Sequence, residues 1–209
     1  ESIIFNLEST DSNSNARCGT IVTPSGNIFT PVFMPVGTQG TVKGVMPRDL
    51  QQCVKASVIL GNTYHLRLRP GPELIGDQGG LGAFMNWQGP ILTDSGGFQI
   101  FSLANLREVT DLGVNFRSHL DGAELFLGPR EAIEIQACLR SDIAMCLDEC
   151  PPADASEKEV RDAVRRTSLW ALQCKETWLN SAGPDKGRLL FGIVQGGSFE
   201  SLRIRSAEE

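Results

Sequence analysis

Four short apolar runs recur along the chain, and each ends in a polar or glycine-rich segment. The runs occupy residues 57–63, 90–96, 143–149 and 189–197. Continuous apolar runs of this length are typical of strands that are buried on both faces of a parallel sheet. The pattern therefore predicts four parallel strands with polar residues at their carboxyl ends.

Segments with helical features lie between these runs. Residues 47–55 and 129–139 each open with a proline, which is favoured in the first turn of a helix. Ser156 is followed three residues later by Glu159, a pairing that caps helix N-termini, and this predicts a long helix running toward Trp178.

The alternation of strand, polar segment and helix predicts an α/β fold, best satisfied by a (β/α)8 TIM barrel with its ligand site at the carboxyl ends of the strands. A whole barrel takes about 250 residues, and the last residues look like the inside of a helix. We therefore expect residues 1–209 to form a single domain holding only the first four to five βα units, continued beyond Glu209. Residues 1–31 are expected to form an N-terminal β-hairpin under the barrel, and residues 32–209 the βα units.

The net charge of −6 argues against a protein that holds nucleic acid through a generally basic surface. Local basic patches remain candidates, although each by itself is better explained as a solvated face. These patches are Lys43 to Arg48, Arg67 to Arg69, and Arg161 with Arg165 and Arg166.

The six cysteines form no CxxC pair, which favours free thiols in a reducing compartment. No apolar stretch is long enough to span a bilayer, and residues 1–5 lack the features of a secretory signal. These features predict a cytoplasmic protein without a membrane partner.

Asp94 follows the second apolar run and precedes Ser95, Gly96 and Gly97. A carboxylate at this position is suited to hydrogen bonding or proton transfer, while the glycines let backbone N–H groups approach a ligand. The equally weighted alternative is an Asx turn in which Asp94 caps a helix beginning near Phe98.

Asp148 and Glu149 end the third run in the same way, and Gln195 ends the fourth. A carboxylate can accept two parallel hydrogen bonds from the N1–H and amine of guanine, and an amide can donate to its O6. Gln195 alone is more simply a strand-end residue bonded to a neighbouring loop.

The aromatic side chains leave two interpretations open. Phe98 is placed to stack on a purine, although a lone phenylalanine belongs more often to a core. We expect His65 and His119 to be structural, and the three tryptophans, Trp87, Trp170 and Trp178, to be core or helix-face anchors.

Six words of the sequence, in order and along nearly the whole chain, resemble the bacterial tRNA-guanine transglycosylases. They are Thr30–Thr38, Leu60–Leu66, Leu68–Gly71, Leu92–Gln99, Asp148–Cys150 and Phe191–Gly197. Several unrelated words in one order are far more specific than a single short motif.

The resemblance implies roles for individual residues. Asp94 would bind the base and act as proton acceptor and donor, in a loop with Ser95, Gly96, Gly97 and the stacking ring of Phe98. Asp148 would grip the base edge and Gln195 its carbonyl side. Asn62 and Gln99 would hold Asp94, and Cys150 would mark the bacterial branch, which inserts an aminomethyl-deazaguanine.

The family reaction exchanges the wobble guanine of tRNA for a deazaguanine by double displacement, through covalent catalysis with proton transfer. The resemblance further implies tRNA and the deazaguanine base as partners, a homodimer, and a structural zinc ion. Both the nucleophilic aspartate and the zinc ligands belong to the later half of the family pattern, so no metal ligand is expected in this segment.

Two other functions are compatible with a barrel that carries carboxylates at its strand ends. One is a glycoside hydrolase that uses Asp94 or Glu149 as its acid. The other is a non-catalytic, transglycosylase-like subunit that serves as partner to an active one.

Overall fold

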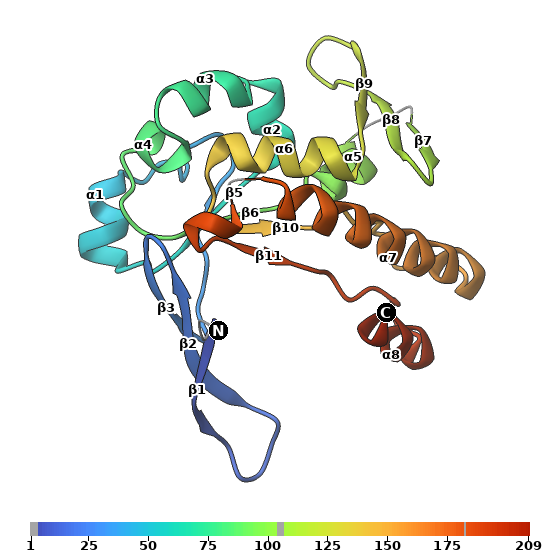
Figure 1. Cartoon of the computed structure of the whole chain (residues 1–209), viewed down its shortest axis with the longest axis horizontal. Helices are drawn as coiled ribbons and strands as arrows, with labels where there is room; N and C mark the ends of the chain where they lie inside the picture. The colour runs from blue at the N-terminus through green and yellow to red at the C-terminus, as the bar shows by residue number, and fades with distance from the viewer. Residues whose placement is uncertain (1–3, 104–106, 182) are drawn as a thin grey trace.

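A five-stranded parallel sheet forms the centre of the protein, as a computed structural model shows for residues 4–103, 107–181 and 183–209 (Figure 1). Each of the four predicted apolar runs contributes one strand. The fifth, β4, has only two residues, too few to produce a recognisable apolar run. The strands lie in the order in which they occur along the chain: β4 (Val36–Gly37), β5 (Ile59–Gly61), β6 (Ile91–Thr93), β10 (Ile143–Met145) and β11 (Leu189–Phe191).

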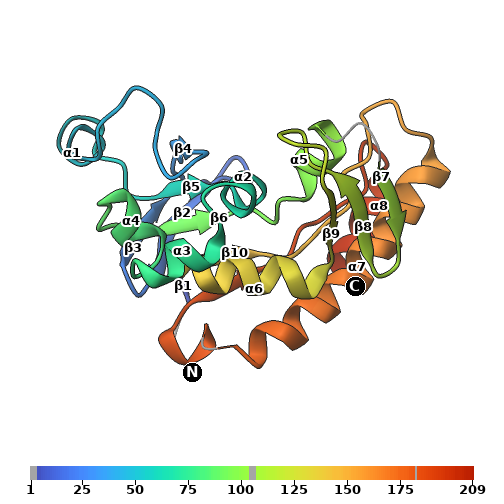
Figure 2. The same ribbon diagram turned by 90° about the horizontal axis from the view of Figure 1, so that it is seen from above.

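Helices connect the strands, and the two longest, α6 (Pro129–Leu139) and α7 (Glu157–Leu179), pack against each other beside the sheet (Figure 2). The predicted cap of α7 is confirmed, because Glu159 accepts the Ser156 N–H at 2.8 Å. The remaining helices are α1 (Pro47–Asp49) with the π-helix Leu50–Val54, α2 (Thr63–Leu68), α3 (Pro72–Asp77), α4 (Leu81–Met85), α5 (Gly97–Leu103), the 3-10 helix Pro184–Lys186, and α8 (Glu200–Glu208).

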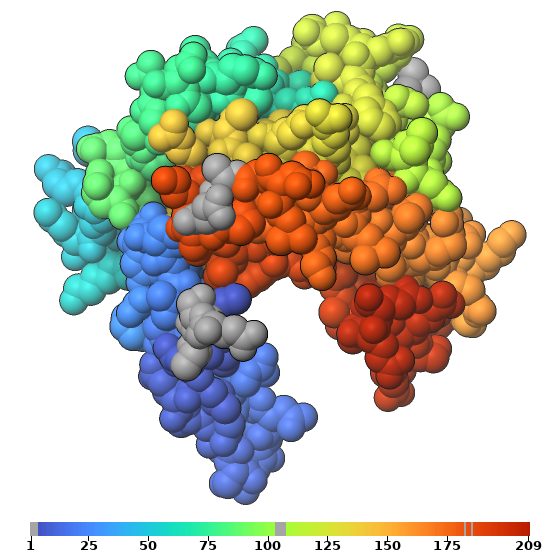
Figure 3. Space-filling view, in the orientation of Figure 1, coloured from blue at the N-terminus to red at the C-terminus, as the bar shows by residue number. Residues whose placement is uncertain are grey.

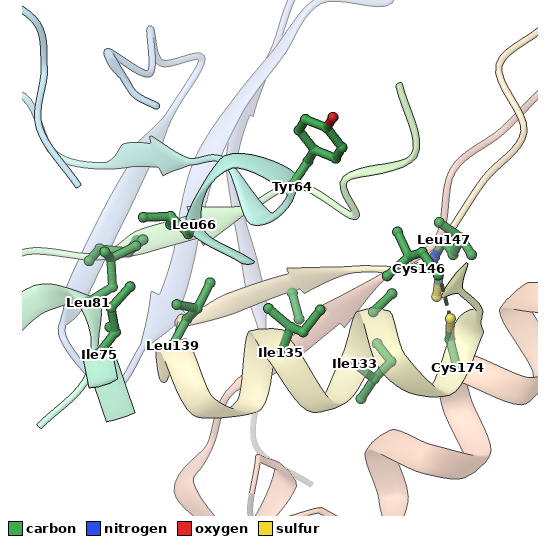
Figure 4. Close-up of a cluster of buried hydrophobic side chains, with 14 of the residues drawn as sticks. Tyr64, Leu66, Ile75, Leu81, Ile133, Ile135, Leu139, Cys146, Leu147 and Cys174 are labelled. Carbon is green, nitrogen blue, oxygen red and sulfur yellow. Dashed lines mark hydrogen bonds between the residues drawn. The ribbon is translucent and has the colours of Figure 1, made fainter. Parts of the chain in front are cut away.

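Apolar clusters cover both faces of the sheet, as a strand buried on both sides requires. Ala144 belongs to the main cluster, which includes Leu139 and Ile133 of α6 (Figure 4). Ile143 and Met145, its neighbours on the strand, belong to a second cluster under the N-terminal sheet. The predicted core positions of Trp87, Trp170 and Trp178 are confirmed, since all three are buried.

The N-terminal segment forms a three-stranded antiparallel sheet of β1 (Phe5–Thr10), β2 (Arg17–Thr23) and β3 (Gly26–Thr30). The expected hairpin is present as β2 and β3, and β1 adds a third strand to it. The Ser25 N–H at its turn donates to Asp142 Oδ1 at 3.0 Å, while Asp142 Oδ2 accepts from Ile91 N at 2.9 Å. This turn therefore closes the amino ends of β6 and β10.

A second antiparallel sheet interrupts the βα units that were expected in residues 32–209. It consists of β7 (Arg107–Thr110), β8 (Gly113–Arg117) and β9 (Glu124–Leu127), between α5 and α6. Gly113 has φ of +148°, and a Cβ there would lie 2.6 Å from the Leu127 carbonyl oxygen. The short strands of this sheet are polar on one face, so they carry no continuous apolar run.

A hollow of about 660 Å³ opens between α7, β11 and α8. The space-filling view shows the N-terminal sheet and α8 projecting on either side of a notch (Figure 3). The residues that line the hollow include Ile4, Leu172, Leu179 and Val194.

Candidate active site

Asp94 lies directly after β6, and its carboxylate is held by groups from two segments. Oδ1 accepts from the Thr63 N–H at 2.9 Å and from the Gly96 N–H at 3.0 Å, and Oδ2 accepts from Asn62 Nδ2 at 2.6 Å. The bond to Gly96 is the Asx turn considered above. The bonds from Asn62 and Thr63 add a contact with the end of β5, so the carboxylate does more than shape its own turn.

Asn62 is oriented for this contact by a second hydrogen bond. It is the N-cap of α2, and its Oδ1 accepts from the His65 N–H at 3.1 Å. With the oxygen used in capping, the amide nitrogen is left to donate to Asp94. An aspartate could make the cap but could not make this donation, so the position favours asparagine.

Burial is the main cause of the raised pKa of Asp94. It raises the pKa of this carboxyl from 3.8 to about 6, against the hydrogen bonds from Thr63 and Gly96, and the nearby Asp148 raises it further. A carboxyl with such a pKa exchanges its proton near neutral pH. It can therefore act first as a proton acceptor and then as a donor.

Asp148 follows β10 and bonds to residues that follow the two neighbouring strands, β6 and β11. Its Oδ1 accepts from Ser95 Oγ at 3.1 Å, and its Oδ2 accepts from Gln195 Nε2 at 2.8 Å. Burial raises the pKa of Asp148, although the bonds from Ser95 and Gln195 oppose that effect. The sequence predictions of Asp148 and Gln195 thus fall in one hydrogen-bonded group with the Asp94 loop.

The glycines of the loop allow its close packing. Gly96 has φ of +80°, and a Cβ on Gly97 would lie 2.8 Å from the Asp148 carbonyl oxygen. Phe98, the next residue, is 58% exposed, so the alternative that it belongs to the core is wrong. Gln99 Oε1 is buried and has no hydrogen-bond partner among the residues that the structure describes, and the expectation that Gln99 holds Asp94 stays a prediction.

Glu149 and Cys150 continue the segment after Asp148. Cys150 is half-buried, and burial together with the charge of Asp148 raises the pKa of its thiol. Glu149 forms an ion pair with Arg166, whose side chain is only 16% exposed. The assignment of Arg166 to a solvated face was therefore wrong, because a basic residue on a helix does not reveal from sequence which carboxylate it meets.

His119 contacts Tyr64, which follows Asn62 by two residues. Tyr64 and His119 Nδ1 share a hydrogen bond of 2.8 Å, and the two rings stack at 5.5 Å between centroids. His65 meets the same histidine edge to face at 5.6 Å. These contacts tie the turn between β8 and β9 to α2, consistent with the structural role expected for both histidines.

Comparison with known proteins confirms the family resemblance of the sequence. The sequence profile of the family described as queuine tRNA-ribosyltransferase matches residues 11–209. A queuine tRNA-ribosyltransferase of Oceanobacillus iheyensis is 52% identical over 207 residues, which is 99% of this chain and 53% of that protein. The chain belongs to this family. Similar relatives bearing the same name occur in Staphylococcus haemolyticus, 53% identical over 94% of this chain and 50% of that protein, and in Solidesulfovibrio magneticus, 53% identical over 94% of this chain and 52% of that protein.

The chain spans about half the length of the curated queuine tRNA-ribosyltransferases that it matches. Enzymes of this family are generally zinc-dependent. Among residues 4–103, 107–181 and 183–209, no three His, Cys, Asp or Glu side chains are grouped so that they could hold a metal ion. Within the same residues, no helix combines the length and apolarity that crossing a membrane requires.

Proposed function

We propose that the protein exchanges the wobble guanine of tRNA for 7-aminomethyl-7-deazaguanine, and that the residues around Asp94 and Asp148 form its base-binding pocket. The observation that carries the proposal is the junction of three strand ends, in which Asp148 is held by Ser95 and Gln195 beside the Asp94 loop. Membership of the queuine tRNA-ribosyltransferase family supports the reaction class.

The proposed pocket retains hydrogen-bonding capacity for a purine. A carboxylate has about four acceptor sites, and Asp148 uses two of them for Ser95 and Gln195. The remaining sites can accept the N1–H and amine of guanine. Gln195 donates one of its two amide hydrogens to Asp148, which leaves the other for the guanine O6.

Asp94 is proposed to move the proton at the departing and incoming base. It receives three hydrogen bonds, from Asn62, Thr63 and Gly96, so the carboxylate keeps room for one more partner. Its pKa of about 6 suits a group that must accept and release a proton in one cycle. Phe98, exposed two residues after Gly96, is proposed to stack on the base.

The fold is proposed to be part of a (β/α)8 barrel. Five parallel strands in sequential order are the arrangement of such a barrel, in which active sites lie at the carboxyl ends. The nucleophilic aspartate, the ligands of a structural zinc ion and the tRNA-tracking loops are assigned by family resemblance to the second half. A homodimer and a cytoplasmic location are proposed on the same basis.

The test is incorporation of radiolabelled guanine into tRNA by the complete protein. Asp148→Ala is expected to lower kcat/KM for exchange roughly 100-fold or more, because it removes two hydrogen bonds to a charged group, each worth about 1.5–3 kcal/mol. Asp154→Ala removes an exposed carboxylate of the following loop and is the matched control.

If Asp148→Ala exchanged guanine at the wild-type rate, the proposed binding of the base by Asp148 would be refuted. A complete protein that binds tRNA but exchanges no guanine would instead indicate the non-catalytic partner. Hydrolysis of a saccharide without base exchange would support the glycoside hydrolase.

A further inference from the structure

Glu149 forms an ion pair beneath the proposed base-binding pocket. This residue directly follows Asp148, and its Oε2 bonds with Nη1 of Arg166 on α7. The two side chains are only 17% and 16% exposed, respectively. Each charge is therefore partly desolvated, and either one left alone would lose the partner that offsets this cost.

The same helix also binds the backbone of this segment. The Glu149 N–H donates to Thr167 Oγ1 at 3.0 Å, and the Leu147 N–H donates to Cys174 Sγ at 3.4 Å. Figure 4 shows Cys174 beside Leu147 and Cys146. The residues on both sides of Asp148 are therefore fastened to α7, while Asp148 itself is bonded to the neighbouring strand ends.

Arg166 also lies near the turn between β7 and β8. Its Nε is 3.5 Å from Asp111 Oδ1, an ion-pair contact without a hydrogen bond, and the Asp111 carbonyl accepts from Trp170 Nε1 at 2.9 Å. Arg165 also pairs with Asp111, at 2.6 Å, but it is half-exposed. A chain of contacts thus leads from the β7–β8 turn through Arg166 to Glu149.

A partly buried ion pair seldom adds stability over well-packed apolar residues, and in some proteins such a pair specifies geometry instead. We propose that Arg166 is a positioning residue: by holding Glu149, it sets the place of Asp148 relative to Ser95 and Gln195, and thereby the affinity for the base. This inference rests on the proposed base-exchange function. It assigns Arg166 no contact with the substrate.

The test compares Arg166→Met with Arg165→Met in the complete protein, using guanine exchange into tRNA. Arg166→Met is expected to raise KM for the free base roughly 10- to 100-fold, the range for a small misplacement of a binding group. KM for tRNA should change by less than about twofold, because the proposed tRNA-tracking loops of the second half also hold that substrate, whereas the free base is held by the pocket alone. Arg165→Met removes a neighbouring charge that also pairs with Asp111, and both KM values should stay within about twofold.

A double variant separates positioning from loss of stability. Arg166→Met alone leaves Glu149 partly buried and without its Arg166 partner, whereas Glu149→Leu combined with Arg166→Met removes both charges. The double variant should regain Tm but keep the raised KM for the base. Recovery of the base KM together with Tm would overturn the positioning role, and so would an unchanged base KM in Arg166→Met.

The controls distinguish the two levels of the proposal. If the unmodified protein exchanges no guanine, the proposed function fails and the role of Arg166 fails with it. If the unmodified protein is active and Arg166→Met raises the KM values for base and tRNA alike, only the positioning role is refuted.

Discussion

Replacing Asp94 by asparagine should make the stability of the protein less dependent on pH. Burial raises the pKa of Asp94 from 3.8 to about 6 in the folded protein. Between these values the folded state keeps a proton that the unfolded chain has released. Stability contributed by this proton is complete below pH 3.8 and is lost as the pH rises through about 6.

The size of this effect follows from the two pKa values. Each tenfold difference in proton affinity corresponds to 1.36 kcal/mol, so the change from 3.8 to about 6 amounts to about 3 kcal/mol. Asparagine has nearly the shape of a protonated aspartate and does not titrate. It also leaves one donor among Asn62, Thr63 and Gly96 without its partner, a loss that is the same at every pH.

Urea unfolding of the complete wild-type and Asp94→Asn proteins from pH 4 to pH 8 measures this quantity. The free energy of unfolding of Asp94→Asn minus that of the wild type should increase by about 2 kcal/mol between pH 4 and pH 7 and then level off, since at pH 4 the unfolded chain has already released part of its proton. Asp154→Asn, at an exposed position, controls for the loss of one negative charge. A difference that stays constant over the whole range would refute the conclusion that burial of Asp94 sets its acidity. The same variant should lose guanine exchange while tRNA binding is largely kept.

Two further substitutions test the local geometry. Gly97→Ala places a methyl group 2.8 Å from the Asp148 carbonyl oxygen. We expect the free energy of unfolding in urea to fall by about 1–3 kcal/mol and calorimetry to show weaker base binding. Unchanged values would show that the loop accommodates the methyl group. Ser156→Ala removes the capping hydroxyl of α7 and should cost about 1 kcal/mol of unfolding free energy, whereas Ser198→Ala, at an exposed position, should have little effect; equal unfolding free energies for the two variants would contradict the capping role.

The parts of the fold that were predictable from sequence have strong local signals. The apolar runs located β5, β6, β10 and β11, and the Ser156–Glu159 pair located the start of α7. The antiparallel sheet between α5 and α6 escaped prediction because its short strands alternate between buried and exposed positions and carry no continuous apolar run. The two residues of β4 had no signal of their own.

The candidate site divides in the same way. Asp94, Asp148 and Gln195 were recognisable because each follows an apolar run, and the carboxyl ends of parallel strands share one edge. The pairing of Arg166 with Glu149 joins residues 17 positions apart on different elements. No spacing rule connects such residues, so only the folded structure reveals the contact.

The contact between Ser25 and Asp142 constrains the order in which the chain acquires its structure during synthesis. The two residues are 117 positions apart, and the cluster under the N-terminal sheet also needs Leu189. Each parallel strand can dock on its predecessor as it leaves the ribosome, but the N-terminal sheet must wait for β10 and β11. Its apolar underside, which includes Ile28, therefore stays uncovered until β10 and β11 have been synthesised. This interval is when binding by a chaperone would matter most.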